Sequence, residues 1–381
     1  MDFKNMSQKK RILCIAALVL VVVALTLAIY VMTTIEKSPA PPPSDTPTAE
    51  PSPTPSPAPS PSPEVSPTPE PGYDGARNPL TGLPTAADLS ANRPIAVVIN
   101  NRKIAQPQLG VSKADIIFEA PVEGGLTRML AVFQDVTDAG EIGSVRSARL
   151  YFIDIAQGFD AIFVHAGGSP GAYAALASRD VTHVDGVNGA RTEIFYRDAG
   201  RRQTMGYEHS LLTSSAKIAQ YFPGYTFRQT HENGYSAGWT FLDDYALAFG
   251  EAAAKLAVEF SSSKSTSFTY DGATGLYAAS QHGGAYKDGN NGAPLTFANV
   301  ITLDTKIAQI RNDPEGRLDV TLTGSGTGTL AIGGAYTAIK WSKASETAQF
   351  VFTDSAGNPV TLRAGRTYIA VIGSGMKASY S

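Results

Sequence analysis

The pattern of hydrophobic and polar positions divides the 381-residue chain into three unlike segments. In the first, residues 12–32 (ILCIAALVLVVVALTLAIYVM) form a run of 21 positions without a charged side chain. A helix of that length would span about 31 Å, close to the hydrocarbon thickness of a bilayer. Lys9, Lys10 and Arg11 precede the run, so the positive-inside rule places residues 1–11 in the cytoplasm and the remainder outside. The pattern predicts one N-terminal transmembrane anchor.

A cleaved signal peptide is the alternative interpretation of this run. The apolar region of a signal peptide normally has about 7–15 residues and is followed by a small-residue cleavage site. This run is longer, and the sequence TTIEKS behind it does not form such a site. Cys14 suggests lipoprotein processing, but a lipidated cysteine should end the apolar stretch, and Cys14 lies two residues inside it. We therefore favour an uncleaved anchor.

The second segment, residues 38–72, contains fifteen of the 25 prolines and one branched aliphatic residue, Val65. Such a composition cannot form a core, and proline favours the extended polyproline II conformation. At about 3.1 Å per residue the segment could reach roughly 100 Å. We expect a spacer that holds a globular head away from the membrane. A Pro-rich recognition ligand is the alternative.

The third segment begins near residue 78 and first alternates strand-like and helix-like patterns. A β-branched run predicts a buried strand over 94–100. Ser169 and Pro170 are typical of the N-cap and first position of a helix. These and similar signals predict strands at 94–100 and 160–167, a hairpin of 114–122 and 126–135 around Glu123-Gly124-Gly125, and helices at 147–159, 169–178 and 214–222. Residues 78–235 are therefore predicted to form an α/β domain, a mixed sheet with flanking helices.

From about residue 236 the pattern changes to short β-like runs separated by Gly, Asn, Asp and Ser. Repeated turn signals at this spacing are typical of an all-β module. Residues 236–376 are therefore predicted to form a β-rich C-terminal domain.

Composition narrows the function classes. A net charge of −3 and a pI near 6 argue against a nucleic-acid partner. A single cysteine excludes a disulfide framework and any multi-cysteine metal site, and no histidine pair has the spacing of a helical metal site. We expect no metal and no cofactor. Only 17% of residues are charged, against roughly 25% in typical proteins, so a local group of arginines stands out.

That group suggests an anion-binding pocket. Guanidinium groups suit carboxylate or phosphate, and a helix N-terminus favours negative charge. Arg146 and Arg149 would share a helix face. The candidate ligand-binding residues are Arg128, Arg146, Arg149, His165 and Ser169, with Glu119 and Glu123 nearby in sequence. In the alternative interpretation, these arginines form structural ion pairs with Glu119 and Glu123.

Two patterns would suit an enzyme. Residues 167–171 fit G-x-S-x-G between a strand and a helix, as in a serine nucleophile elbow. However, Pro170 follows the serine and has no N–H to donate to an oxyanion. Glu119 and Glu123 could form a glycosidase pair if the strand extended to both. No catalytic residue can be assigned from either pattern, and we lean away from an enzyme.

Several sequence blocks together resemble one family. They are NPLTGLP (78–84), PIAVVINN (94–101), ADIIFEAPVEGGLTRMLAVF (114–133), IGSVRSAR (142–149) and FVHAGGSP (163–170), with weaker matches in the second half. The chain resembles the YerB-like family of bacterial cell-envelope proteins, whose two-part domain has no known function. The resemblance implies an extracytoplasmic protein, and it supplies no catalytic residues to transfer. Relatives are often lipid-anchored, whereas this chain has a predicted transmembrane anchor.

These observations together predict an extracytoplasmic head anchored in the cell membrane by a single span. We expect it to be a binding or scaffold module for cell-wall polymer or for an envelope protein. The alternative is an enzyme that hydrolyses wall glycan or peptide.

Overall fold

The computed structural model of the chain describes residues 73–189, 191–243 and 248–381. All of the described residues belong to one compact unit. The predicted anchor at 12–32 and spacer at 38–72 lie outside the described residues. Within the described ranges, no helix has the length and apolar character needed to cross a membrane.

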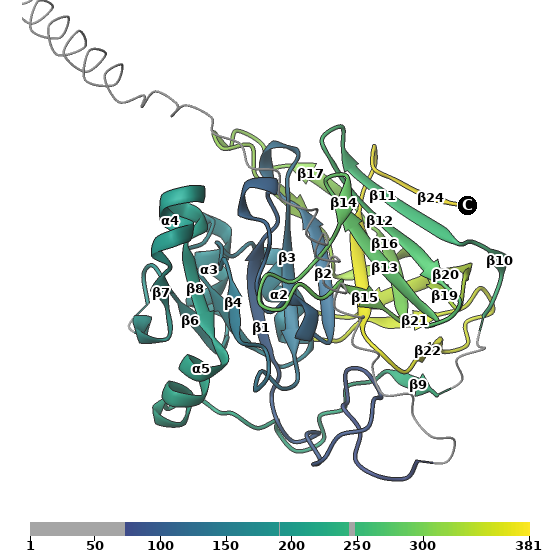
Figure 1. Cartoon of the computed structure of the whole chain (residues 1–381), viewed down its shortest axis with the longest axis horizontal. Helices are drawn as coiled ribbons and strands as arrows, with labels where there is room; N and C mark the ends of the chain where they lie inside the picture. The colour runs from purple at the N-terminus through teal and green to yellow at the C-terminus, as the bar shows by residue number, and fades with distance from the viewer. Residues whose placement is uncertain (1–72, 190, 244–247) are drawn as a thin grey trace, which may run out of the picture. The chain divides into compact units, whose positions relative to one another are not determined.

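An 11-stranded mixed sheet forms the centre of the head (Figure 1). Its strands run in the order β10-β20-β19-β16-β23-β2-β3-β1-β5-β6, and β21 pairs with β20. In that order they are Glu251–Ala252, Ala335–Lys343, Gly324–Ile332, Asn299–Asp304, Thr367–Ile372, Ile116–Pro121, Thr127–Phe133, Ile95–Asn100, Ile162–His165 and His183–Asp185, with β21 at Val351–Thr353.

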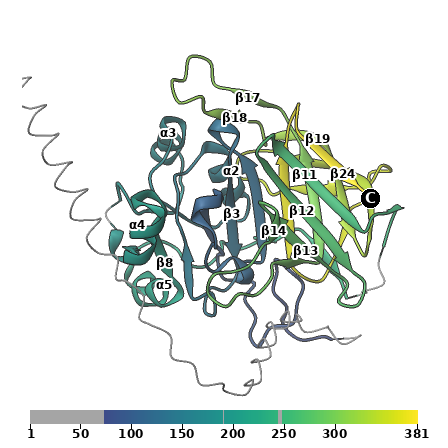
Figure 2. The same ribbon diagram turned by 45° about the horizontal axis from the view of Figure 1, so that its top comes forward.

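Both halves of the sequence contribute strands to this sheet. β23 lies parallel to β2 on one side, with Thr367 opposite Ile116, and parallel to β16 on the other. The mixed α/β N-terminal part and the β-rich C-terminal part expected from the sequence are both present, and they share one continuous sheet (Figure 2).

The main sheet is covered on both faces, which explains the continuous apolar runs of its strands. In β1, Ile95, Val97 and Ile99 enter one hydrophobic core, whereas Ala96 and Val98 enter the other. The second core also contains apolar residues of the helices α2 (Leu150–Gly158) and α3 (Pro170–Ser178). The first contains residues of a second, six-stranded sheet.

The six-stranded sheet is antiparallel, and its strands alternate between buried and exposed positions, as expected for a sheet with one covered face. It comprises β14 (Gly284–Ala285), β13 (Leu276–Gln281), β12 (Lys264–Asp271), β11 (Lys255–Ser261), β24 (Lys377–Tyr380) and β15 (Thr296–Phe297).

Smaller elements complete the head. A three-stranded sheet contains β4 (Glu141–Gly143), β8 (Leu211–Ser214) and β7 (Tyr196–Arg197), next to the helices α4 (Ala199–Met205) and α5 (Ser215–Tyr221). Two strand pairs are β17 (Ile307–Gln309) with β18 (Leu318–Val320) and β22 (Thr361–Arg363) with β9 (Thr240–Leu242). Short 3-10 turns lie at Lys103–Ala105 (η2), Val111–Lys113 (η3), Glu123–Gly125 (η4), Thr192–Ile194 (η5), Tyr207–His209 (η6) and Phe222–Gly224 (η7).

Candidate functional site

The candidate site lies where three parallel strands of the main sheet end. β1, β5 and β6 are parallel neighbours, so their carboxyl ends meet at one edge. In open α/β sheets, ligands bind outside the carboxyl ends of the strands. The loops at this edge are residues 166–169 after β5 and 186–188 after β6. We call this the carboxyl edge.

The loop 144–149, between β4 and α2, brings arginines to the carboxyl edge. Arg146 N donates to Val98 O, and Ala166 N donates to Arg146 O. Ala148 N donates to Gly167 O, so the loop crosses the ends of β1 and β5. Arg128, at the start of β3, lies opposite Asn100 at the end of β1. The fold therefore gathers Arg128, Arg146 and Arg149 in one region.

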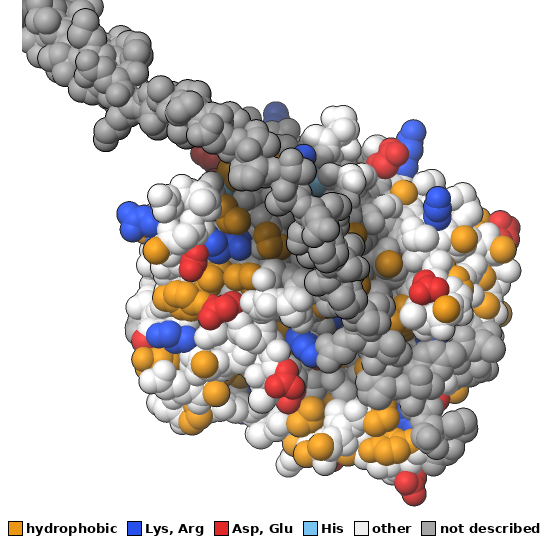
Figure 3. Space-filling model, in the orientation of Figure 1, with side chains coloured by type: hydrophobic (Ala, Val, Ile, Leu, Met, Phe, Trp, Pro, Cys, Tyr) orange, Lys and Arg blue, Asp and Glu red, His pale blue; other side chains and the backbone are white. Residues whose placement is uncertain are grey.

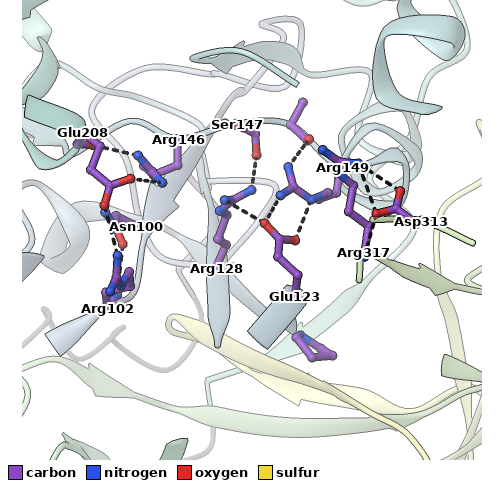
Figure 4. A network of polar contacts seen from close by, with 12 residues as sticks. Asn100, Arg102, Glu123, Arg128, Arg146, Ser147, Arg149, Glu208, Asp313 and Arg317 are labelled. Carbon is purple, nitrogen blue, oxygen red and sulfur yellow. Dashed lines mark hydrogen bonds and ion pairs between the residues drawn. The ribbon is translucent and has the colours of Figure 1, made fainter. Parts of the chain in front are cut away.

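Arg128 and Arg149 share one carboxylate, that of Glu123 (Figure 4). Arg149 binds both oxygens of Glu123, and Arg128 Nη2 lies 3.5 Å from Oε1. Burial, followed by the charges of Arg149 and Arg146, lowers the pKa of Arg128 to about 9. Burial acts to raise the pKa of Glu123, but the charges of Arg128 and Arg149 outweigh it and hold that pKa below its ordinary value. These two arginines therefore have an internal counter-ion, as the ion-pair alternative expects for Glu123.

A second carboxylate, Glu208 in η6, pairs with two other arginines (Figure 4). Arg146 Nη1 donates to Glu208 O at 2.8 Å, and Nη2 donates to Oε2 at 3.2 Å. Arg102 Nη1 donates to Oε1 at 3.0 Å. Burial lowers the pKa of the neighbouring His209. Arg146 thus belongs to a different ion-pair group from Arg128 and Arg149.

An open cleft of about 370 Å³ lies between these loops and η6. Its floor is formed by backbone and small or apolar side chains of Val145, Ala166, Gly167 and Leu211. Its polar walls include Arg146, Ser147, Tyr173, Asn188, Arg197 and Glu208, and the exposed side chains of Val187 and Tyr207 stand at its border. On the face shown in Figure 3, hydrophobic side chains lie among Lys and Arg over the region of α4, β7 and β8.

His165 does not face this cleft, because it is fully buried at the end of β5. Its Nδ1 lies 2.9 Å from Gly167 O, and its Nε2 lies 3.1 Å from Nδ1 of His183. Burial lowers the pKa of His165 to about 4, despite the opposing charge of Asp185. His165 is therefore a neutral residue that supports the Gly167 turn.

Asp185 supports the same turn. Its Oδ1 accepts hydrogen bonds from Gly167 N at 2.7 Å and Val187 N at 2.9 Å, and its Oδ2 accepts from the Tyr173 hydroxyl at 2.8 Å. This carboxylate holds the loops after β5 and β6 together and positions Tyr173 in the wall of the cleft.

Ser169 is the N-cap of α3, with its hydroxyl accepting from Ala172 N at 3.2 Å. The ring nitrogens of His165 contact Gly167 and His183, so Ser169 and His165 do not form a nucleophile–base pair.

Glu119 lies in the interior between the two parts of the head. It is fully buried and pairs with Lys264 of β12, with Nζ 3.0 Å from Oε1. Its oxygens also accept hydrogen bonds from Asn101, Thr127, Thr266 and Tyr368. Burial acts to raise the pKa of Glu119, but Lys264 and these hydrogen bonds lower it below its ordinary value. The strand β2 ends at Pro121, before Glu123, so the two glutamates do not lie on one strand face.

Two other hollows, of about 360 and 550 Å³, open near the amino ends of β1 and β5. In the first, Arg93 and Arg228 both pair with Asp160, which also contacts His231. These contacts hold residues 228–231 against the residues that precede β1 and β5. Within the described residues, no group of three or more His, Cys, Asp or Glu side chains could hold a metal ion.

Sequence reasoning did not identify Arg197, Tyr207, Asn188 or Glu208. These residues belong to short elements, β7 and η6, and to a turn, and nothing in their local sequence distinguishes them. Pairing of β7 and β4 with β8 brings Arg197, Tyr207 and Glu208 to the carboxyl edge, and pairing of β6 with β5 brings Asn188 there.

Fold and site together define a class of protein: an α/β part and a β-rich part that share one sheet, with a basic cleft at the carboxyl edge of the α/β part. Residues 80–228 match the family described as protein of unknown function (DUF3048), N-terminal domain, and residues 256–369 match its C-terminal domain. The chain belongs to this family.

Relatives agree with that assignment. The "Putative lipoprotein YerB" of Bacillus subtilis (strain 168) is 34% identical over 264 residues, which are 66% of this chain and 73% of that protein. The crystal structure of the YerB protein from Bacillus subtilis superimposes with a TM-score of 0.68 at 29% identity and covers 80% of this chain and 99% of that chain. The resemblance to the YerB-like family is thereby confirmed.

Proposed function

We propose that this protein is a membrane-tethered extracytoplasmic head that binds anionic groups of the cell-wall polymer at the carboxyl edge. The apolar run at 12–32 would anchor it, and the Pro-rich segment 38–72 would hold the head away from the membrane. The name of the Bacillus subtilis relative, a lipoprotein, supports a membrane-associated protein outside the cytoplasm.

The observation that carries this proposal is the charge of the carboxyl edge. Five arginines lie there (Arg102, Arg128, Arg146, Arg149 and Arg197) against the three carboxylates of Glu123, Asp185 and Glu208. A concave surface with an excess of one charge attracts ligands of the opposite charge. Outside a bacterial membrane, the wall supplies a dense array of such anions.

The same geometry favours binding over hydrolysis. An enzyme of this kind would need an acid–base pair within reach of one cleft. Glu123 and Glu208 are each held by two arginines, His165 is buried and neutral, and Ser169 caps a helix. Each of these groups already binds other residues of the protein, so none is free to act as the acid or the base.

Co-sedimentation with purified sacculi tests the proposal. A fragment of residues 59–381, which includes all of the described residues, is incubated with sacculi and centrifuged at two salt concentrations. We expect the head to pellet with the sacculi at low salt and to be released at high salt, because salt screens exposed charges. Soluble muropeptides in the supernatant would instead establish an enzyme, and absence of the head from the pellet at both salt concentrations would reject wall binding.

Protease accessibility tests the topology in the full-length chain. In intact protoplasts we expect external protease to remove the head and leave a membrane-embedded fragment that retains residues 1–32. A head that remains protected, or that is released by alkaline carbonate without proteolysis, would contradict the anchor.

A further inference from the structure

Arg197 differs from the other arginines of the carboxyl edge. Arg128 and Arg149 pair with Glu123, and Arg102 and Arg146 pair with Glu208. Among the residues that the structure describes, no carboxylate pairs with Arg197, although it lines the cleft. A guanidinium group in a cleft without an internal counter-ion is available to an external anion.

The guanidinium of Arg197 is also held in place. Its Nη1 donates to Tyr207 O at 2.7 Å and to Ser210 Oγ at 3.4 Å. Its central carbon lies 3.5 Å from the centroid of the Tyr207 ring. The hydrogen bonds use one nitrogen, and the stacked ring fixes the plane of the group. When a ligand binds the remaining N–H groups, the side chain of Arg197 therefore loses less conformational entropy than a mobile arginine would.

The rest of the cleft wall indicates which anion would fit. Asn188 donates its Nδ2 to the Tyr173 hydroxyl, so its amide is oriented. The Tyr173 hydroxyl is in turn fixed by Asp185. Because Nδ2 binds Tyr173, the carbonyl oxygen is the group of Asn188 that could accept a hydrogen bond from a ligand N–H.

We propose that the cleft binds the carboxylate of an N-acylated amino acid, as found at the end of a wall peptide, with Arg197 as its main contact. Arg197 supplies a guanidinium that no internal carboxylate holds, and a guanidinium suits a single carboxylate. A carboxylate accepts two parallel hydrogen bonds from a guanidinium, and an acyl-amino-acid carries an N–H next to it for the Asn188 carbonyl. A phosphate group has no such N–H. This inference rests on the proposed function and names the chemical group that the head recognises.

Three probes and the 59–381 fragment test the inference by ligand-observed NMR titration. The probes are N-acetyl-D-alanyl-D-alanine, its C-terminal amide, and glycerol 3-phosphate. We expect the free acid to bind at least tenfold more tightly than the amide or the phosphate. Equal or tighter binding of either control probe, or no binding of the acid, would overturn the inference.

Two variants assign the contact to Arg197. Arg197→Gln should weaken binding of the acid at least tenfold, and Arg197→Lys should restore only part of the affinity, because lysine keeps the charge but not the paired donors. The matched control is Arg191→Gln, which removes a guanidinium that also stacks on aromatic rings (Tyr225 and Phe227) but lies outside the cleft. It should bind the acid within twofold of the wild type. If Arg197→Gln and Arg191→Gln lost affinity for the acid equally, the role of Arg197 would be overturned.

Melting temperatures of the Arg197 and Arg191 variants check that each variant is folded. Sedimentation with sacculi separates the two proposals. If Arg197→Gln pellets as well as the wild type, the cleft is not the wall contact, although wall binding stands. If the wild type itself does not pellet, the proposed function fails.

Discussion

Two buried polar residues, Glu119 and Lys264, connect the parts of the head at the scale of single side chains. Glu119 belongs to β2 of the main sheet, and Lys264 to β12 of the six-stranded sheet. Both are almost completely buried. A charge in such surroundings is tolerated only when it is paired and hydrogen-bonded. The pair therefore specifies how the two sheets meet.

Lys264→Met should strongly destabilise the head. It leaves the Glu119 carboxylate buried without its cation, a change that typically costs about 3–5 kcal/mol. Urea unfolding followed by circular dichroism measures the loss. The double variant with Glu119→Gln removes both charges and should recover a large part of it. If the single variant is as stable as the wild type, the pair does not connect the sheets as described.

His165 should make stability depend on pH. Its pKa is about 4 in the folded head, against 6.5 for the ordinary group, because burial disfavours the charged ring. Between these values the unfolded chain binds more protons, so stability is complete above about pH 6.5 and falls as the pH decreases toward 4, by up to about 3 kcal/mol. His165→Gln should flatten this decline in urea titrations at a series of pH values. An unchanged slope would contradict it.

At the scale of elements, side-chain caps and hydrogen bonds to the backbone fix the short loops of the carboxyl edge. The turn between β5 and α3 shows this: Asp185 binds the amide of Gly167, and Ser169 caps the helix that follows. Gly167 adopts a left-handed conformation, with φ of +76°, that favours glycine. The Gly167, Ser169 and Pro170 positions of the G-x-S-x-G pattern thus each have a structural explanation.

The Ser169→Ala variant distinguishes the role of Ser169 as an N-cap from a role as a nucleophile. Losing an N-cap typically costs about 1 kcal/mol, so we expect a small decrease in melting temperature and sacculus binding within twofold of the wild type. Ser169→Asp, which can still cap the helix, should recover the stability. Loss of function at unchanged stability would instead revive a chemical role for the hydroxyl.

Local signals allowed much of the α/β part to be predicted. Ser169 and Pro170 marked the start of α3, and the β-branched run at 94–100 marked β1. Predicted helices at 147–159 and 214–222 correspond to α2 and α5, which are shorter. The interior position of Glu119 could not be predicted, because it depends on Lys264, 145 positions further along the chain. Arg197 was missed because its setting arises from the pairing of β7 with β8.

At the scale of the whole molecule, the continuous main sheet makes the two parts of the head interdependent. Strand β23 lies between β16 and β2, so it belongs to the centre of the sheet. Neither part alone could complete the backbone hydrogen bonds of its strand at that junction.

Expressing 73–235 and 248–381 separately tests this interdependence. We expect each fragment to be poorly folded or aggregated by circular dichroism and gel filtration, and co-expression to yield a soluble complex. Two fragments that each unfold cooperatively would show that the parts are independent domains.

The position of β23 also has a consequence for biogenesis. Residues 367–372 are synthesised about 250 positions after β2, yet they fill a gap in the middle of the sheet next to it. Contacts so distant in sequence slow folding, and the unpaired edge of β2 promotes aggregation until β23 pairs with it. A chain that emerges from its N-terminus would present the edge of β2 until residues 367–372 had also emerged. The edge of β2 is therefore the part of the head most exposed to wrong association until β23 pairs with it.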